Sequence, residues 1–260
     1  MNSRPARAQK PPSNSPKKQA KRATESLAAD RVSALARANR PAREPFADKA
    51  YRELRARILD NSMPSGEQFT EEELAAMLQM SRTPTREAML RLAGEGLVEV
   101  RPRHGMRVKP VSMADMREIY EVLTALESTA AALAAARSDQ GDSIRLLRKA
   151  ISDMDAALER DDLKAWAEAD ERFHTLLVAA AGNQRLMDLV QTYVGQSHRV
   201  RMQTLRLRPK PMISNRDHEA VVDAVEAHDA KRARELHYTH REKSGRTLVE
   251  LLASHGLTQL

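Results

Sequence analysis

The 260-residue sequence contains no cysteine. Disulfides and thiolate metal sites are therefore excluded, and a reducing cytosol is compatible with the chain. Aromatic residues make up only 3% of the chain while hydrophobic residues make up 41%, so Leu, Ala, Val and Met must fill the core. A core of this kind favours packed helices over a β-sandwich.

Long hydrophobic runs are also missing. No window holds the roughly 18–20 uninterrupted apolar residues of a membrane span. The basic N-terminus is not followed by the apolar stretch of a signal peptide. We therefore expect a cytoplasmic protein without a membrane partner, long enough to form two modest domains.

The excess of positive charge belongs to the N-terminal segment. Residues 1–43 carry a net charge of +9, residues 44–112 a net charge of zero, and residues 113–260 a net charge of −2. The first segment also has five prolines and no glycine, a composition typical of disorder. We predict a disordered basic tail over residues 1–44. It is either an arm that adds sequence-independent affinity for phosphates or a solubilising extension, and the sequence leaves both open.

Three short helices are predicted after the tail. Residues 46–61 have helical periodicity, and a Pro-Ser-Gly turn at 64–66 ends that segment. Thr70 and Glu73 then have the spacing of a capping box, with apolar residues behind them. A short break at 79–81 leads into the third helix.

The third helix, residues 81–96, has the features of a DNA-recognition helix. Ser81 and Thr83 are residues of N-cap type, and glycines stand at the expected exit. Arg82, Thr83 and Arg86 gather at the N-terminal end, where the helix dipole also favours phosphate. Arginines can read guanine edges and hydroxyls can bind phosphates. Taken alone, the run fits an amphipathic surface helix equally well.

The residues that follow predict a small β-hairpin. Residues 97–100 and 106–109 have strand composition, with the basic segment Arg-Pro-Arg-His-Gly between them. Three helices followed by a two-stranded basic wing make a winged helix-turn-helix, whose second and third helices read DNA. We assign residues 45–112 to this DNA-binding domain.

Residues 113–260 are predicted to be entirely helical. Six runs with helical periodicity are separated by short breaks, which indicates an all-α bundle of six or seven helices. The predicted runs are 113–137, 142–159, 163–181, 184–206, 213–227 and 230–253. The fold class is therefore mainly α.

A second set of polar residues lies in this helical part. Asp170 and His174 are four residues apart and share one helix face, and His218 and His240 lie on separate helices. Three imidazoles and a carboxylate suit a divalent ion such as Zn, Ni, Mn or Co. By spacing alone the signal is weak, and His237 competes with His240. His198 and His228 look like surface or cap residues.

The chain closely resembles the GntR superfamily of transcription regulators. Residues 74–89, LAAMLQMSRTPTREAM, resemble its DNA-binding signature, and residues 94–98 and the wing tip His104-Gly105 continue it. The second half resembles the FCD ligand-binding domain of the FadR subfamily. Residues 170–174 match the first metal motif of that domain, and Asp217-His218 match its third ligand. His240 matches its fourth ligand, so the resemblance favours His240 over His237. The resemblance covers about residues 45–255.

The resemblance implies a ligand-responsive, homodimeric regulator, usually a repressor, and not an enzyme. Its partners would be double-stranded operator DNA and a small organic acid bound near the metal. Two departures stand out. Leu123 occupies a position where many relatives have an arginine that helps hold a carboxylate ligand. Glu72 stands where a few relatives have an arginine that contacts a DNA base. Leucine cannot pair with a carboxylate, which argues against a simple dicarboxylate effector unless Arg199, Arg201 or Arg206 substitutes.

The implied site residues can be carried over one by one. Those implied for the major groove or its phosphates are Arg82, Thr83 and Arg86, with Ser81 on the DNA backbone and His104 and Gly105 in the minor groove. Those implied for the metal are Asp170, His174, His218 and His240. Two alternatives remain open: a metal-dependent enzyme that uses these four residues, and a non-sensing DNA-binding protein with a purely structural metal.

Overall fold

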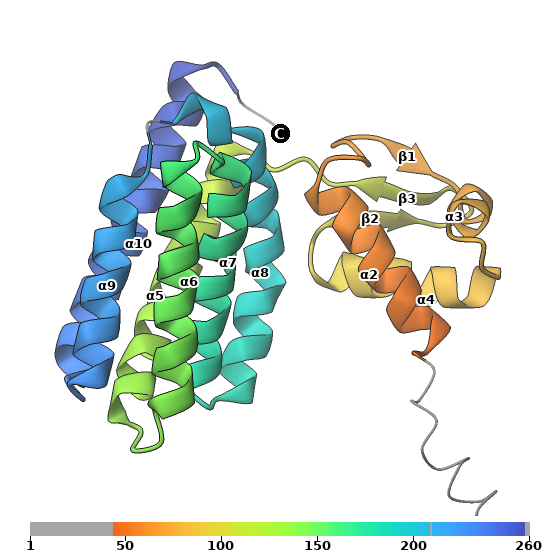
Figure 1. The fold of residues 1–260 in the computed structure, drawn as a ribbon. Coiled ribbons are helices and arrows are strands. Elements are labelled where there is room, and N and C mark those ends of the chain that lie inside the picture. Colours follow the sequence, from red (N-terminus) through yellow and green to blue (C-terminus); the bar gives the residue numbers. More distant parts are fainter. Residues whose placement is uncertain (1–43, 209, 258–260) are drawn as a thin grey trace, which may run out of the picture. The chain divides into compact units, whose positions relative to one another are not determined.

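The computed structural model describes residues 44–208 and 210–257 (Figure 1). The predicted tail, except Glu44, lies outside these residues. Helices dominate the described chain, which confirms the mainly α fold class. The first elements in chain order are α2 (Phe46–Leu59), β1 (Gln68–Phe69), α3 (Glu71–Leu78), α4 (Arg82–Gly94), β2 (Val98–Arg101) and β3 (Gly105–Val108).

The second and third helices begin and end as local chemistry dictates. Thr70 and Glu73 form both hydrogen bonds of the predicted capping box at the start of α3. Gln79 ends that helix in the left-handed conformation, with φ 53°, and so produces the tight turn before α4. Ser81 occupies the N-cap position of α4, but its side chain makes no capping hydrogen bond. That hydroxyl therefore does not cap the start of the helix.

The wing is part of a three-stranded antiparallel sheet with the order β1-β3-β2. Val98 pairs with Val108 and Val100 pairs with Met106, so one face of the hairpin is apolar. Strand β1 was not predicted, because two residues are too few to show an alternating pattern. A single core, which includes Leu54, Leu74 and Leu92, joins the helices to this sheet.

Six long helices form most of the remaining described residues, as predicted, and lie side by side in Figure 1. Their boundaries agree closely with the predicted runs, with one exception. The run 184–206 is not one helix, because α8 stops at Gln203 and a 3-10 turn follows. Arg208 is extended, at φ −97° and ψ 148°, as expected for a residue before proline. The elements are α5 (Met113–Ala136), α6 (Gly141–Glu159), α7 (Leu163–Ala180), α8 (Gln184–Gln203), η1 (Leu205–Leu207), α9 (Met212–Glu226) and α10 (Ala230–Ser254).

Helix α5 is central to this bundle. Among the described residues it is the one helix that is long and apolar enough to cross a membrane by length and composition. In this fold it packs against α7, α8, α9 and α10. Its apolar residues, such as Ile119, Leu123 and Ala130, are buried in the bundle core. Its apolar composition is thus accounted for by packing between helices.

Candidate functional site

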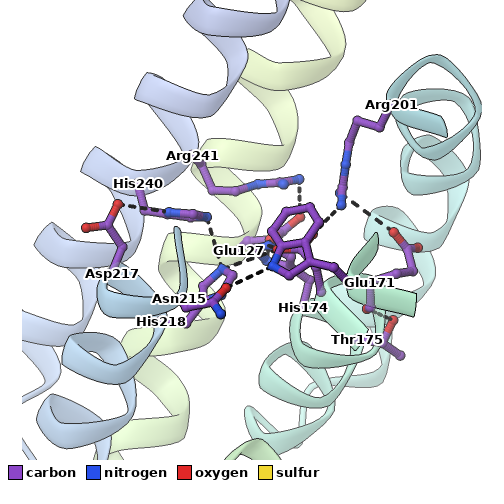
Figure 2. A network of polar contacts seen from close by, with 12 residues as sticks. Glu127, Glu171, His174, Thr175, Arg201, Asn215, Asp217, His218, His240 and Arg241 are labelled. Atoms are coloured by element: carbon purple, nitrogen blue, oxygen red, sulfur yellow. Dashed lines mark hydrogen bonds and ion pairs between the residues drawn. The ribbon is translucent and has the colours of Figure 1, made fainter. Parts of the chain in front are cut away.

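The structure brings the four predicted metal ligands together inside the bundle. The three histidines among them are labelled in Figure 2. Helix α7 supplies Asp170 and His174, α9 supplies His218 and α10 supplies His240. All four side chains are buried, with at most 4% of each residue exposed. Because isolated ionisable groups are costly to bury, their clustering calls for a chemical explanation.

The donor atoms have spacings close to those that one divalent ion requires. Two ligand atoms, each roughly 2.1 Å from an ion, lie no more than about 4.2 Å apart. The Nε2 atoms of His218 and His240 are 3.1 Å apart. Asp170 Oδ1 lies 3.7 Å from His218 Nε2 and 3.9 Å from His174 Nε2. Donor atoms of the three histidines all lie within 4.8 Å of one another, so a contraction of less than about 1 Å would suffice.

The site also favours the protonation states that metal ligation needs. Burial lowers the pKa of His218 well below its ordinary value of 6.5, and burial also lowers the pKa of His240. Burial would raise the pKa of Asp170, but the neighbouring Arg201 guanidinium outweighs it and the pKa is lowered. At neutral pH these two imidazoles are therefore neutral and the carboxylate is ionised, as a metal requires.

A second layer of charged residues orients the ligands. Glu127 Oε2 lies 2.9 Å from His174 Nδ1, and Asp217 Oδ2 lies 3.3 Å from His240 Nδ1. Each contact leaves the Nε2 atom of its histidine facing the cluster. Arg201 donates to Oδ2 of Asp170, so Oδ1 is the oxygen left facing the histidines. Carboxylate–histidine pairs of this kind commonly accompany metal ligands.

Sequence reasoning missed Glu127 and Arg201 as members of this layer, because no local motif marks them. Glu127 is fully buried on α5, where it also binds Arg241 at 2.7 Å. The one available signal was a glutamate in an otherwise uncharged stretch, Leu-Glu-Ser-Thr-Ala-Ala. Arg201 was named only as one of three arginines that could hold an effector carboxylate. The structure pairs it with Asp170 and leaves Arg206 exposed.

The remaining histidines occupy other places. His237 is fully buried and contacts Glu127 Oε2 at 3.1 Å, so it belongs to the network behind the cluster. A second geometric grouping of Glu127, His174 and His237 does exist, but it uses the nitrogen of His174 that faces away from Asp170. His198 is half-buried against Glu171, and His228 is exposed at the end of α9.

A small polar cavity of about 30 Å³ adjoins the cluster. Asp170, His174 and His240 form part of its wall, so the predicted ligands are exposed to it. Leu123 does not line it and is fully buried in the core. The other lining residues are Tyr120, Trp166, Arg201, Arg208, Ser214, Arg241 and Ser244.

The predicted DNA-reading residues lie together on an exposed helix end. Ser81, Arg82, Thr83 and Arg86 are all exposed at the start of α4. Arg82 forms an ion pair with Glu72 of α3 at 3.0 Å, and both side chains are more than half exposed. This pairing holds the acidic Glu72, which stands where some relatives have an arginine, next to the basic cluster.

The wing tip presents the other two predicted residues. His104 is exposed, and Gly105 has φ +81°. A Cβ atom at Gly105 would lie 2.0 Å from the carbonyl oxygen of Phe69 in β1. Glycine at this position is therefore required by the fold of the wing itself.

Comparison with known proteins identifies both halves of the chain. Residues 46–108 match the family of bacterial regulatory proteins called the gntR family, and residues 118–243 match the FCD domain. A regulator of the HTH type in the TAR-I ttuE-ttuC' intergenic region of Agrobacterium vitis is 45% identical over 157 residues, which cover 60% of this chain and 86% of that protein. The HTH-type transcriptional repressor RspR of Escherichia coli K12 is 29% identical over 186 residues, covering 72% and 81% of the two chains.

Solved structures share the fold. E. coli McbR/YncC superposes with a TM-score of 0.69 at 18% identity, covering 80% of this chain and 99% of that one. A GntR regulator from Rhodococcus sp. RHA1 superposes with a TM-score of 0.63 at 22% identity, covering 78% and 97%. Together with the exposed basic helix end and the buried histidine cluster, these matches show that the chain belongs to the GntR family of DNA-binding transcription regulators and carries an FCD domain.

Proposed function

We propose that the protein is a ligand-responsive transcriptional repressor of the FadR subfamily, a cytoplasmic homodimer controlled by a small organic acid. Residues 45–112 would form the operator-reading domain, residues 113–260 the sensing and dimerisation domain, and residues 1–44 a basic tail. The observation that carries the sensing function is the cluster of Asp170 and three histidines, buried beside a polar cavity. RspR, a relative that covers most of the chain, is itself named a repressor.

The donor set supports a divalent metal ion of the borderline class, Zn, Ni, Mn or Co. Asp170, His174, His218 and His240 would hold it, with Glu127 and Asp217 orienting two of the rings. When bound, the ion would supply a Lewis-acidic position for a carboxylate oxygen of the effector. The chain's own contribution is to keep Asp170, His218 and His240 deprotonated and to aim the ligand atoms at one point.

DNA recognition is proposed for the start of α4 and for the wing. Arg82 and Arg86 are placed to reach base edges or phosphates in the major groove, with Thr83 and Ser81 on the DNA backbone. His104 and Gly105 would enter the minor groove. Arg86 makes no ion pair within the described chain, so it is ready to bind DNA, whereas Arg82 must first leave Glu72.

Control of DNA binding requires two states with different effector affinity. An effector that binds both states equally tightly shifts nothing. We propose that the acid, bound between the metal and the cavity wall, favours a bundle state in which the two winged domains of the dimer no longer match two half-sites of a pseudo-palindrome.

The family consists of transcription regulators, and no observation favours the metal-dependent enzyme considered from the sequence. The decisive test of the DNA-reading assignment is Arg86→Ala in a fluorescence-anisotropy assay with operator DNA. We expect specific binding to be lost while the fold survives. Arg91→Ala, at the other end of the same helix and paired with Asp48, is the control for lost charge. Equal specific binding by Arg86→Ala and the wild-type protein would refute the assignment.

A further inference from the structure

One cationic side chain in the metal-proximal cavity has no carboxylate partner. Arg208, in the extended segment after η1, lines the cavity, and its Nη2 donates to Thr204 Oγ1 at 2.9 Å. Its Nε is completely buried and has no hydrogen-bond partner in the described chain. A guanidinium stays charged in a protein and offers five donors, so an unpaired buried donor on it calls for an acceptor.

The other two arginines of the cavity are already neutralised. Arg201 is paired with Asp170 and lies 3.8 Å from Glu171 Oε2. Arg241 donates to Glu127 Oε1 at 2.7 Å. Within the described part of the chain no carboxylate lies within ion-pair distance of Arg208. The protein side of the cavity therefore has one uncompensated positive charge.

We propose that Arg208 receives the anionic group of the effector, and that the effector is a small monocarboxylate with a neutral polar substituent. Arg208 would take the role that Leu123, buried in the core, cannot fill. A guanidinium fork matches a carboxylate in two parallel hydrogen bonds. The cavity beside Arg208 measures only about 30 Å³, so we expect a short acid with one carboxylate to fit better than a longer acid with two. This inference rests on the proposed sensing function and names its ligand class.

The neutral groups of the cavity fit the same ligand. Ser214 and Ser244 line it from α9 and α10, and their hydroxyls can donate to or accept from a hydroxyl or carbonyl substituent. Ser214 also lies in the first turn of α9, whose positive dipole end favours an anion. The cavity of about 30 Å³ holds about two water molecules, so the effector must be small and the walls must move outward to admit it.

The test uses the full-length, metal-loaded protein and three probes that differ in charge. Glycolate carries one negative charge, malonate carries two and glycolamide carries none. Binding is measured by isothermal titration calorimetry, and metal content by elemental analysis of the same samples. The variants are Arg208→Gln and Arg208→Lys. The matched control is Arg206→Gln, an exposed arginine two residues away that does not line the cavity.

We expect the wild-type protein to bind glycolate more tightly than malonate and not to bind glycolamide. Arg208→Gln should weaken glycolate binding about 10- to 100-fold, the value of a charge-assisted hydrogen bond. Arg208→Lys should lie in between, because it keeps the charge and loses the fork. Arg206→Gln should match the wild-type protein, and metal content should be the same in all four proteins.

Three results would overturn the inference: no glycolate binding by the wild-type protein, tighter binding of malonate than of glycolate, or glycolate affinity of Arg208→Gln within about twofold of wild type. Failure of the proposed function gives a different result. In that case neither the wild-type protein nor any of the Arg208 variants would take up a divalent metal.

Discussion

The buried carboxylate of Glu127 makes the strongest prediction about stability. It is completely buried and contacts Arg241 Nη2 at 2.7 Å, His174 Nδ1 at 2.9 Å and His237 Nε2 at 3.1 Å. Burial alone would raise its pKa, but the charge of Arg241 and the two imidazole contacts outweigh burial and hold the pKa well below its ordinary value of 4.5. The folded state thus depends on this negative charge.

Glu127→Gln removes that charge with little change of shape and leaves Arg241 buried without compensation. Removing one partner of a buried pair costs about 3–5 kcal/mol. For a chain of this length each 1 kcal/mol corresponds to roughly 2–4 °C in Tm, so we expect a fall of at least about 6 °C. Thermal unfolding of chelated protein, followed by circular dichroism, measures the effect without a contribution from metal binding.

Two further variants make the reasoning refutable. Glu226→Gln breaks an exposed ion pair with Arg148 and should cost less than about 1 kcal/mol. Glu127→Met combined with Arg241→Met removes both buried charges and should recover much of the lost stability. A Glu127→Gln protein that melts within about 2 °C of wild type would show that the charge of Glu127 does not hold this network together.

Three other outcomes follow from the same structure. Burial holds His218 and His237 neutral in the folded state, with the pKa of His237 lowered to about 3, while the unfolded chain takes up protons near pH 6.5. Stability of chelated protein in urea should therefore be highest above pH 6.5 and fall as the pH drops, and a flat profile between pH 7 and 5 would contradict this. Zinc at about a hundred times its Kd should stabilise the protein by about 2.7 kcal/mol at neutral pH, but not the His218→Ala variant, and equal stabilisation of both would exclude His218 as a ligand. Gly105→Ala should destabilise the winged domain by more than about 2 kcal/mol in chemical denaturation, because φ is +81° and the new Cβ meets the Phe69 carbonyl, and an unchanged midpoint would refute that clash.

Local signals made much of the fold predictable. The capping box at Thr70 and Glu73 has a fixed spacing, and the structure contains both of its hydrogen bonds. The bundle helices were predictable because apolar residues recur with the helical period between polar breaks. This pattern involves only residues that are close together in the sequence. The strand β1 could not be predicted, because its two residues gain their structure from pairing with β3, far away in the sequence.

The site was predictable only in part, for a related reason. Asp170 and His174 share a helix face, so their proximity is visible in the sequence. Spacing alone gave only a weak signal for His218 and His240, and the family resemblance was needed to choose His240 over His237. Glu127 and Arg208 lie on other segments and meet the site only through tertiary packing. Periodicity in the sequence does not mark such residues, because their role depends on which distant segments pack against them.

The central claim is that an acid bound beside the metal controls operator binding by the winged domain. It is tested most directly by fluorescence anisotropy of the metal-loaded protein on DNA from upstream of its own gene, with glycolate added in steps. The account predicts specific binding that weakens as glycolate is added, and no such response in the His218→Ala variant or after chelation. Identical responses with and without the metal, or an unchanged binding curve in all samples, would contradict it.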